Sequence, residues 1–407
     1  VRGAEARVRQ QEASYRAATA KFGPSLRLET NVQRWDEPQT TEFSAPGQSG
    51  GAELTVREQT TANVSMTVVQ PLTPLWSIYE AQRIEELSVE QAETSQTETR
   101  RDVALEVVEA YFRLLQARAV RDVAKKSLER RQKQLERARK FKRAEQVPKN
   151  DVLRAKVGVS RAEQQLIQAR GRVDLASAQL ARVMGTSARQ SHVPTSDVDL
   201  DYTPPADVDR AVEVARKRRT AMQEADLRVE QASAGVRAAR SQLLPQINAM
   251  ASYQRSYGST FSNDESFFIG ASLQWTFWQW GTKTFEIDAA KAQKVRAEVG
   301  RSRLERGIEL EVRNAYTNYQ TSRQSLKVAR RAADQARENY RAEKKRYEAK
   351  LSTSIDLLDA ETQLTETRTN VRNAEYQHFI AAAKLRRALG LSPWDTAGDQ
   401  PDSTEVK

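Results

Sequence analysis

The chain has 407 residues, of which 39% are hydrophobic, and it contains no cysteine. This apolar share is low for a compact globule of that length and suits long helices that bury only a narrow seam. The missing cysteine excludes disulfides and thiolate chemistry. The net charge of +11 is compatible with anionic partners such as nucleic acid or lipid. However, the basic residues are spread along predicted helices and mixed with glutamate, so we predict a solvated face and no nucleic-acid partner.

The start of the chain predicts a segment upstream of it. Val1 opens a sequence typical of the middle of a helix, and no signal peptide is visible, so we expect an N-terminal segment to precede it. No run of 18 apolar residues occurs, so no transmembrane helix is predicted.

Two segments early in the chain alternate apolar and polar residues with a period of two. The first follows the helix-ending Pro24 and runs from Leu26 to Val32, and the second runs from Ala62 to Val68. The polar stretch 36–60 between them is expected to be a loop. Each strand would be about ten residues long, the length of a tilted strand that spans a membrane. A half-buried sheet in water would show the same alternation.

A very long helix follows these strands. No residue between about 78 and 143 breaks it, and Thr73-Pro74 provides a start signal. At 1.5 Å per residue it would be roughly 100 Å long, which no compact domain houses. Apolar residues at 3-4 spacing predict a coiled-coil seam. The chain then turns at about 144–150 into a helix of about 35 residues, which gives an antiparallel hairpin.

The second half of the chain repeats this pattern. After Pro245, one alternating run extends from Ile247 to Tyr253 and another from Phe267 to Phe277. A long helix over about 282–349 and a turn at 350–354 follow. Tryptophans lie at the end of the last strand and near the equivalent point of the first half, which is typical of an interfacial girdle: Trp275, Trp278, Trp280 and Trp76.

A constant offset relates the two halves. Tyr111 and Tyr316 lie 205 positions apart in similar surroundings, and so do Asp151 and Asp356. We therefore predict two tandem structural repeats, 1–188 and 207–390, joined by a Pro- and Asp-rich linker over 189–206 and followed by a polar tail over 391–407. The fold class is α+β and mainly α.

Four strands from one chain cannot close a barrel, and lipid does not tolerate open strand edges. The barrel must therefore be shared among copies of the chain, which predicts an obligate oligomer.

Together, the tandem order of helix, strand, strand and helical hairpin and the segment Asp356-Leu-Leu-Asp359-Ala resemble the TolC family of outer-membrane efflux and secretion channels. The resemblance covers about 1–390. It implies a homotrimer with a shared twelve-stranded barrel in outer-membrane lipid and a helical tunnel in the periplasm. It further implies passive conduction from a tripartite efflux or type I secretion assembly, with a periplasmic adaptor (membrane fusion) protein and an inner-membrane pump as partners.

Asp356 and Asp359 are the candidate entrance gate. They lie i,i+3 on one helix face, and in the family the matching pair lines the tunnel entrance, where three copies would form a ring of carboxylates that binds cations. The alternative is a pair of first-turn acidic residues favoured by the helix dipole, with Ser352 or Ser354 as the cap.

Asp151 and Tyr347 are the candidate tip latch, because they match a pair that holds the closed tip together in the family. The latch arginine of the family is Ser352 here, and Lys149 or Lys350 could replace it. For Asp151 the alternative is again a carboxylate at a helix N-terminus.

The two turns would meet the adaptor. The family often has glycine where Glu145 and Lys350 stand, and glycine permits positive φ, so the sequence leaves the turn geometry open. The candidate docking residues are Glu145, Gln146, Val147, Pro148, Lys350, Leu351, Ser352 and Thr353.

No catalytic, cofactor-binding or metal-binding site is predicted. His192 and His378 lack neighbours at ligand spacing, and no Ser-His-Asp set, phosphate loop or zinc motif occurs. The main alternative to a channel is a soluble coiled-coil scaffold, which explains the helices but not four matched strands. A basic helical nucleic-acid binder explains the charge but not the repeat.

Overall fold

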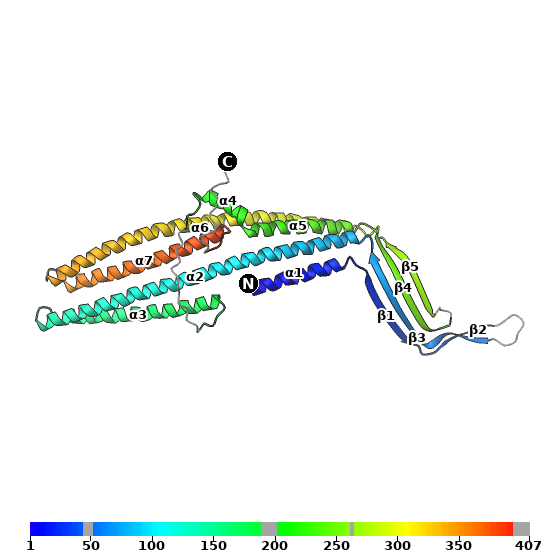
Figure 1. Cartoon of the computed structure of the whole chain (residues 1–407), viewed down its shortest axis with the longest axis horizontal. Helices are drawn as coiled ribbons and strands as arrows, with labels where there is room; N and C mark the ends of the chain where they lie inside the picture. The colour runs from blue at the N-terminus through cyan, green and yellow to red at the C-terminus, as the bar shows by residue number, and fades with distance from the viewer. Residues whose placement is uncertain (44–51, 189–201, 261–263, 394–407) are drawn as a thin grey trace. The chain divides into compact units, whose positions relative to one another are not determined.

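Helices make up most of the computed structural model, which describes residues 1–43, 52–188, 202–260 and 264–393 (Figure 1). The predicted linker over 189–206 and tail over 391–407 lie mostly outside the described residues. None of the described helices is both long and apolar enough to cross a membrane. The helices are α1 (Arg2–Ala20), α2 (Leu75–Arg143), α3 (Lys149–Val183), α4 (Val208–Arg218), α5 (Thr220–Ser241), α6 (Thr282–Glu348) and α7 (Ser354–Ala388). The strands are β1 (Ser25–Arg34), β2 (Gln39–Phe43), β3 (Ala52–Pro71), β4 (Gln246–Ser259) and β5 (Glu265–Gln274).

Backbone contacts divide the chain into two compact units. One unit comprises Val1, Thr97–Met222 and Arg303–Lys407, and the other comprises Arg2–Gln96 and Gln223–Ser302. The long helices α2 and α6, with 69 and 67 residues, contribute to both. All strands belong to the second unit, and both helical turns belong to the first.

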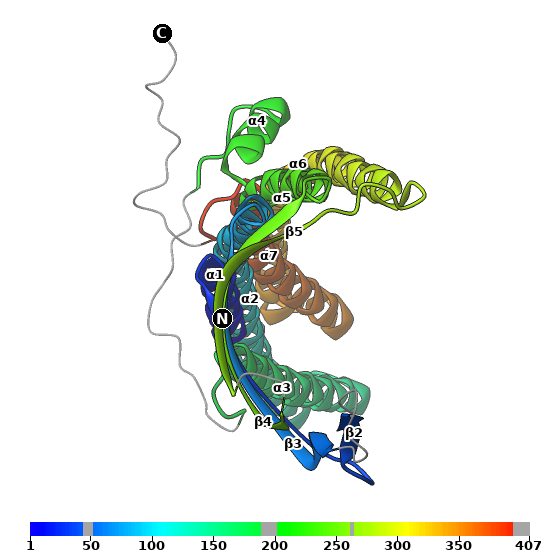
Figure 2. The ribbon, with the colours of Figure 1, turned by 90° about the vertical axis from the view of Figure 1, so that its right-hand side faces the viewer.

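The strands form one antiparallel sheet in the order β1-β3-β4-β5, with β2 paired to β3 (Figure 1). Figure 2 shows the same sheet after a rotation of 90°. The register brings together the segments that the alternation predicted, because Leu26 pairs with Val68, Val68 with Ala251 and Ala251 with Ile269. In the described part of the chain, β1 and β5 are each paired on one side only. The four predicted strands are therefore present, and the sheet has two open edges.

One face of this sheet is apolar and uncovered. Besides the row that contains Leu26 and Ile269, a second row joins Leu28 to Met66, Tyr253 and Phe267. The exposed fractions of Leu28, Phe267 and Ile269 are 68%, 65% and 76%. The opposite face is mostly polar, since Glu29 pairs with Ser65 and Ser65 with Gln254. Within the described residues, this mostly apolar sheet face therefore has no covering layer.

The expectation of a loop over 36–60 was wrong. Gln39–Phe43 is strand β2, and β3 begins at Ala52, well before the predicted Ala62. The segment is polar but rich in threonine, and Leu54 and Val56 alternate with charged and hydroxyl residues. β-branched side chains favour a pleated strand even where the overall composition is hydrophilic.

Narrow seams hold the helices of the first unit together. Ala110, Leu114 and Leu180 are buried between α2 and α3, and Val108 and Phe112 of α2 pack on Ile380 and Ala383 of α7. A third cluster joins α4, α6 and the end of α7, and includes Val312 and Leu385. Apolar burial on one stripe of each helix is what the 3-4 spacing predicts. Most other residues of α6 are exposed.

Glycine ends two of the helices for different reasons. Gly185 after α3 and Gly390 after α7 have φ of +71° and +78°, and each donates its N–H back into the last helical turn. A Cβ on Gly390 would lie 2.8 Å from the carbonyl oxygen of Arg218, whereas one on Gly185 would meet nothing within 4 Å. Only Gly390 is needed for close packing as well as for its backbone conformation.

We therefore predict that Gly390→Ala destabilises the protein more than Gly185→Ala. The left-handed conformation alone costs a non-glycine residue about 1–2 kcal/mol, and the clash with the Arg218 carbonyl adds about 1–3 kcal/mol. Thermal unfolding of the two variants measures the difference. Equal melting temperatures for both variants would contradict this account of the α7 end.

Candidate functional site

The two helical turns of the first unit are built alike. After α2, Glu145 donates its N–H to Lys142 O at 3.0 Å and Gln146 donates to Phe141 O at 2.9 Å. After α6, Lys350 donates to Tyr347 O at 3.1 Å and Leu351 to Arg346 O at 2.8 Å. This pair of backbone hydrogen bonds is the Schellman motif, in which the first residue beyond the helix cap adopts a left-handed conformation.

Non-glycine residues occupy the left-handed positions of both turns. Glu145 has a φ of 59° and Lys350 a φ of 62°. The sequence left the turn geometry open because glycine is missing at these positions. The structure shows that the glycine-like conformation is kept without glycine. Each turn therefore carries the steric cost of a Cβ in a left-handed residue.

A groove of about 410 Å³ lies at the turns and is lined by residues of both. Most of the predicted docking and latch residues face it, whereas the predicted Glu145 and Leu351 are not among its lining residues. Leu351 is 71% exposed. The sequence-predicted residues that line the groove are Gln146, Val147, Pro148, Asp151, Tyr347, Lys350, Ser352 and Thr353.

Asp151 and Tyr347 meet in this groove from different hairpins. The Tyr347 ring is buried and lies with its centroid 6.1 Å from that of Phe141 on α2. Burial, and then the charge of Asp151, raise the pKa of the Tyr347 hydroxyl. Among the described residues no hydrogen bond joins the two side chains. The structure brings the predicted latch pair together but leaves it unbonded.

Ser352 makes its contacts within its own hairpin. Its hydroxyl lies 2.7 Å from Glu343 Oε2 on α6 and 3.2 Å from Asp356 Oδ2 on α7. Lys149 and Lys350 form no ion pair in the part of the chain that the structure describes, so neither replaces the arginine of the family here.

Asp356 closes the N-terminus of α7. The cap residue is Thr353, and neither Ser352 nor Ser354 takes that role. The Thr353 hydroxyl lies 2.7 Å from Asp356 Oδ2 and accepts from the Asp356 N–H at 3.2 Å, and the Thr353 N–H donates to Oδ2 at 3.1 Å. Hydrogen bonds from the Thr353 hydroxyl and N–H, and then from Ser352, lower the pKa of Asp356. This reciprocal arrangement is a capping box.

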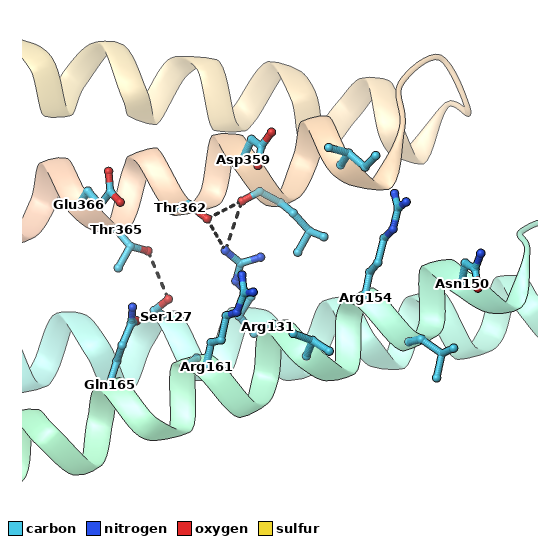
Figure 3. A pocket seen from close by; sticks show the side chains of 16 residues that line it. Ser127, Arg131, Asn150, Arg154, Arg161, Gln165, Asp359, Thr362, Thr365 and Glu366 are labelled. Carbon is cyan, nitrogen blue, oxygen red and sulfur yellow. Dashed lines mark hydrogen bonds between the residues drawn. The ribbon is translucent and has the colours of Figure 1, made fainter.

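Asp359, one helical turn further on, takes no part in this capping box. It is exposed and lines a second groove of about 710 Å³ between α2, α3 and α7 (Figure 3). The described part of the chain shows no hydrogen bond or ion pair to its carboxylate. Of the two predicted gate residues, Asp359 is therefore free to meet a ligand, whereas Asp356 is held by the cap.

The four predicted girdle tryptophans belong to the second unit and are strongly exposed. The exposed fractions range from 54% for Trp275 to 85% for Trp280. Trp275 Nε1 donates to Leu243 O at 3.1 Å, and the rings of Trp278 and Trp280 lie 5.9 Å apart. Large uncovered indoles at the end of an apolar sheet face match the composition of a membrane interface.

Buried ion pairs between helices were not predicted. Glu361 of α7 is only 1% exposed and pairs with Arg130 and Arg131 of α2. Burial raises the pKa of Glu361, and the charges of Arg131 and Arg130 oppose that rise. Arg387 reaches Glu98 at 2.7 Å. The signal was available, because Glu361 stands on the apolar stripe that includes Leu357 and Leu364.

Among the described residues, no cluster of three or more histidine, aspartate or glutamate residues could hold a metal ion. His378 instead packs against Tyr319, and its Nδ1 lies 3.1 Å from the Ser322 hydroxyl.

We predict that Lys350→Gly stabilises the protein by up to about 1 kcal/mol, because glycine removes the left-handed strain but gives the unfolded chain more freedom. Lys350→Ala is the matched control, since it removes the same charge and keeps the Cβ. The free energy of unfolding measured with denaturant distinguishes them. If the alanine variant is stabilised as much as the glycine variant, the strain assigned to Lys350 does not exist.

The sequence is similar to a family of outer-membrane proteins. A profile of the family described as "Outer membrane efflux protein" matches residues 1–186 and 211–391. Outer membrane protein TolC of Salmonella enteritidis is 24% identical over 303 residues, and that of Escherichia coli K12 is 23% identical over 300. These matches cover 70% of the chain, and they span only 60% and 61% of the lengths of the two relatives.

Solved outer-membrane channels share the fold at low identity. The outer membrane protein VceC of Vibrio cholerae has a TM-score of 0.76 at 18% identity, over 96% of this chain and 92% of its own. The open state of the MtrE channel of Neisseria gonorrhoeae has a TM-score of 0.78 at 18% identity, over 96% and 86%. The Campylobacter jejuni channel CmeC scores 0.78 at 15%, over 98% and 84%.

Proposed function

Because the chain belongs to the outer membrane efflux protein family, we propose that it is one protomer of a trimeric channel that conducts substrates passively from the periplasm to the exterior. The energy for transport comes from a partner pump in the inner membrane. The family is one of channels and not of enzymes.

The uncovered apolar face of the sheet carries this proposal. On the outer strands of this face, Leu28, Phe267 and Ile269 are 68%, 65% and 76% exposed. In water such a face would need a covering layer, and the described residues do not supply one. In lipid the face is covered by acyl chains, while the polar face with Ser65 and Gln254 lines the interior. A soluble coiled-coil scaffold leaves this face unexplained.

The open edges of the sheet favour an oligomer. In hydrocarbon, the unpaired backbone groups of β1 and β5 have no water to bond, so each edge must pair with a neighbouring copy. Four strands from each of three copies give the twelve-stranded barrel of the family. The tryptophans Trp76, Trp275, Trp278 and Trp280 then lie at the interface between lipid and water.

The helices would form the tunnel in the periplasm, and the two turns its tip. The groove at the turns is lined by Val147 and Pro148 from one hairpin and Lys350 from the other, so both hairpins offer side chains to one docking partner. We assign this surface to the periplasmic adaptor, with Asp151 and Tyr347 as the contact between hairpins that docking perturbs.

Asp359 is the stronger candidate for the entrance ring. Its carboxylate is exposed and has no hydrogen bond or ion pair to the described residues, whereas Asp356 serves the α7 cap. Three copies would place three free carboxylates from Asp359 around one constriction, with those of Asp356 behind them in the cap. Rings of this kind bind and select cations.

We predict that Asp359→Asn weakens cation selectivity and block by multivalent metal ions at least severalfold in planar bilayers, because it removes the free carboxylate. Asp356→Asn should affect block less and lower the stability of the α7 end, since its carboxylate is the cap acceptor. Single-channel recordings with metal added on the periplasmic side give the comparison. A metal block that is unchanged in the Asp359 variant and lost in the Asp356 variant would reverse this assignment.

We also predict that Ile269→Arg prevents insertion into the outer membrane, because arginine on a lipid-facing strand costs about 2–4 kcal/mol at the bilayer midplane. Ser65→Arg is the control, since it adds the same charge on the opposite face beside Glu29. Heat-resistant oligomers in outer-membrane fractions report insertion. Normal insertion of the Ile269 variant would contradict a lipid contact for this face.

A further inference from the structure

The excess positive charge of the chain is concentrated at one end of the first helical hairpin. Residues 125–161, which run from α2 through the first turn into α3, contain 14 lysines and arginines but only four aspartates and glutamates. This segment therefore carries a net charge of +10, whereas the whole chain carries +11. Basic residues occur on all the long helices, but outside this segment acidic residues almost balance them.

The matching segment of the second repeat is neutral. At the 205-residue offset, residues 330–366 contain eight basic and eight acidic residues. Three ion pairs neutralise charge within α6 itself: Arg337–Asp334, Arg341–Glu338 and Arg346–Glu343. Since both segments form the same elements, a helix, a turn and a second helix, the fold does not require the positive charge of the first.

Most cations of the basic segment have no anionic partner within the described structure. Only four of the 14 form ion pairs there: Arg130, Arg131, Arg137 and Lys140. The other ten are exposed, and their side chains form no hydrogen bond or ion pair with a described residue. The acidic residues of α2 within this stretch are Glu129 and Glu136, and Glu136 already pairs with Lys140. Six of the ten lie on α2, and we call them the basic surface: Lys125, Lys126, Lys133, Arg139, Lys142 and Arg143.

The helix dipole explains only the end of this surface. Cations are favoured in the last turn of a helix, where Arg143 lies. However, Lys125, Lys126 and Lys133 lie ten or more residues before the end of α2. Like charges four residues apart destabilise a helix, and Arg139 and Arg143 are such a pair. An anionic partner would therefore relieve a repulsion that the protein does not compensate by itself.

The length of the basic surface favours an elongated protein over a membrane. Lys125 and Arg143 are 18 residues apart, which is roughly 27 Å along α2 at 1.5 Å per residue. The potential of an anionic membrane falls off within about 10 Å, so a bilayer at the turn would reach only the cations nearest Arg143. A bilayer along the helix would need apolar side chains to insert, and no large apolar side chain of α2 is exposed between these two residues.

The side of the first hairpin that faces α7 suits an acidic partner less well. Arg154 and Arg161 of α3 line the groove of about 710 Å³, but Asp359 and Glu366 of α7 line the same groove (Figure 3). These carboxylates would repel an anion. The six residues of the basic surface line neither this groove nor the groove at the turns, so the outer side of α2 is the better place for an anion.

We propose that the basic surface docks a protein with an elongated acidic surface, and that this protein is the periplasmic adaptor. The inference rests on the proposed function for the identity of the partner, and it adds that the two hairpins contribute unequally. The first hairpin attracts and orients the adaptor along the side of α2 by charge, whereas the neutral second hairpin contributes only its turn. Charges of this kind act mainly on the rate of association.

Binding of the purified periplasmic adaptor to the detergent-extracted wild-type oligomer tests the charge dependence without any variant. The association rate should fall at least about tenfold between about 50 and 300 mM sodium chloride, because salt screens charges at the rim of an interface. The dissociation rate should change much less. An association rate that does not respond to salt, or the absence of binding at low salt, overturns the proposal.

A matched pair of variants locates the contact. The first replaces three residues of the basic surface with glutamine, and it should lower the association rate severalfold at low salt and flatten its salt dependence: Lys125, Lys126 and Lys133. The control removes the same charge from three residues of α6 that have no ion pair to the described residues, and it should change neither quantity: Arg331, Lys344 and Lys345. Surface substitutions of this kind alter stability little, which thermal unfolding would verify. Equal effects of the two variants would overturn the unequal roles of the hairpins.

Vesicles of phosphatidylglycerol and phosphatidylethanolamine test the other occupant. If they bind the wild type but not the first variant, while the adaptor binds both equally well, the basic surface contacts lipid and the proposal is wrong.

Conductance in planar bilayers without the adaptor separates this proposal from the channel function. A conducting oligomer whose adaptor binding ignores salt would keep the proposed function and overturn the acidic docking partner. An oligomer without conductance that binds the adaptor in the salt-dependent way would do the reverse.

Discussion

Backbone hydrogen bonding at the two edges of the sheet is the constraint on which the rest of the structure depends. β1 and β5 each have one unpaired side in the described chain. The sheet also presents a mostly apolar face, whose exposure to water is unfavourable. Lipid acyl chains can cover the apolar face, but they cannot form hydrogen bonds with the backbone groups at the edges. In a membrane only another strand can form those bonds. This is why we propose that the protomer is completed by neighbouring copies. The long helices, which bury only narrow seams, agree with that proposal.

The periodic parts of the fold could be predicted from sequence. The period-two runs around Leu26, Val68, Ile247 and Ile269 form four paired strands, because a slip of one residue would move the apolar side chains to the polar face. The two helices of more than 60 residues followed from the absence of any breaker. Strand β2 was missed because its residues are polar, and polarity hides the strand preference of threonine.

The location of the candidate site could be predicted from the sequence, but the hydrogen bonds of its residues could not. The sequence predicted that Asp151, Tyr347 and most turn residues lie at the two helical turns. It could not tell that Thr353 and Asp356 cap α7 reciprocally, since that depends on which of three neighbouring hydroxyls takes the cap position. Nor could it show that Glu145 and Lys350 adopt the conformation usually reserved for glycine. Glu361 was missed because a single charge on an apolar stripe shows its partners only once the helices are packed.

In the proposed channel, several copies complete the sheet, and they would bring the α7 helices, each with an exposed Asp359, around one axis. The mass of the detergent-extracted protein tests this central claim most directly, and native mass spectrometry would measure it. A trimeric membrane channel predicts three chains in each particle and a requirement for detergent. A single chain that stays in solution without detergent would contradict it.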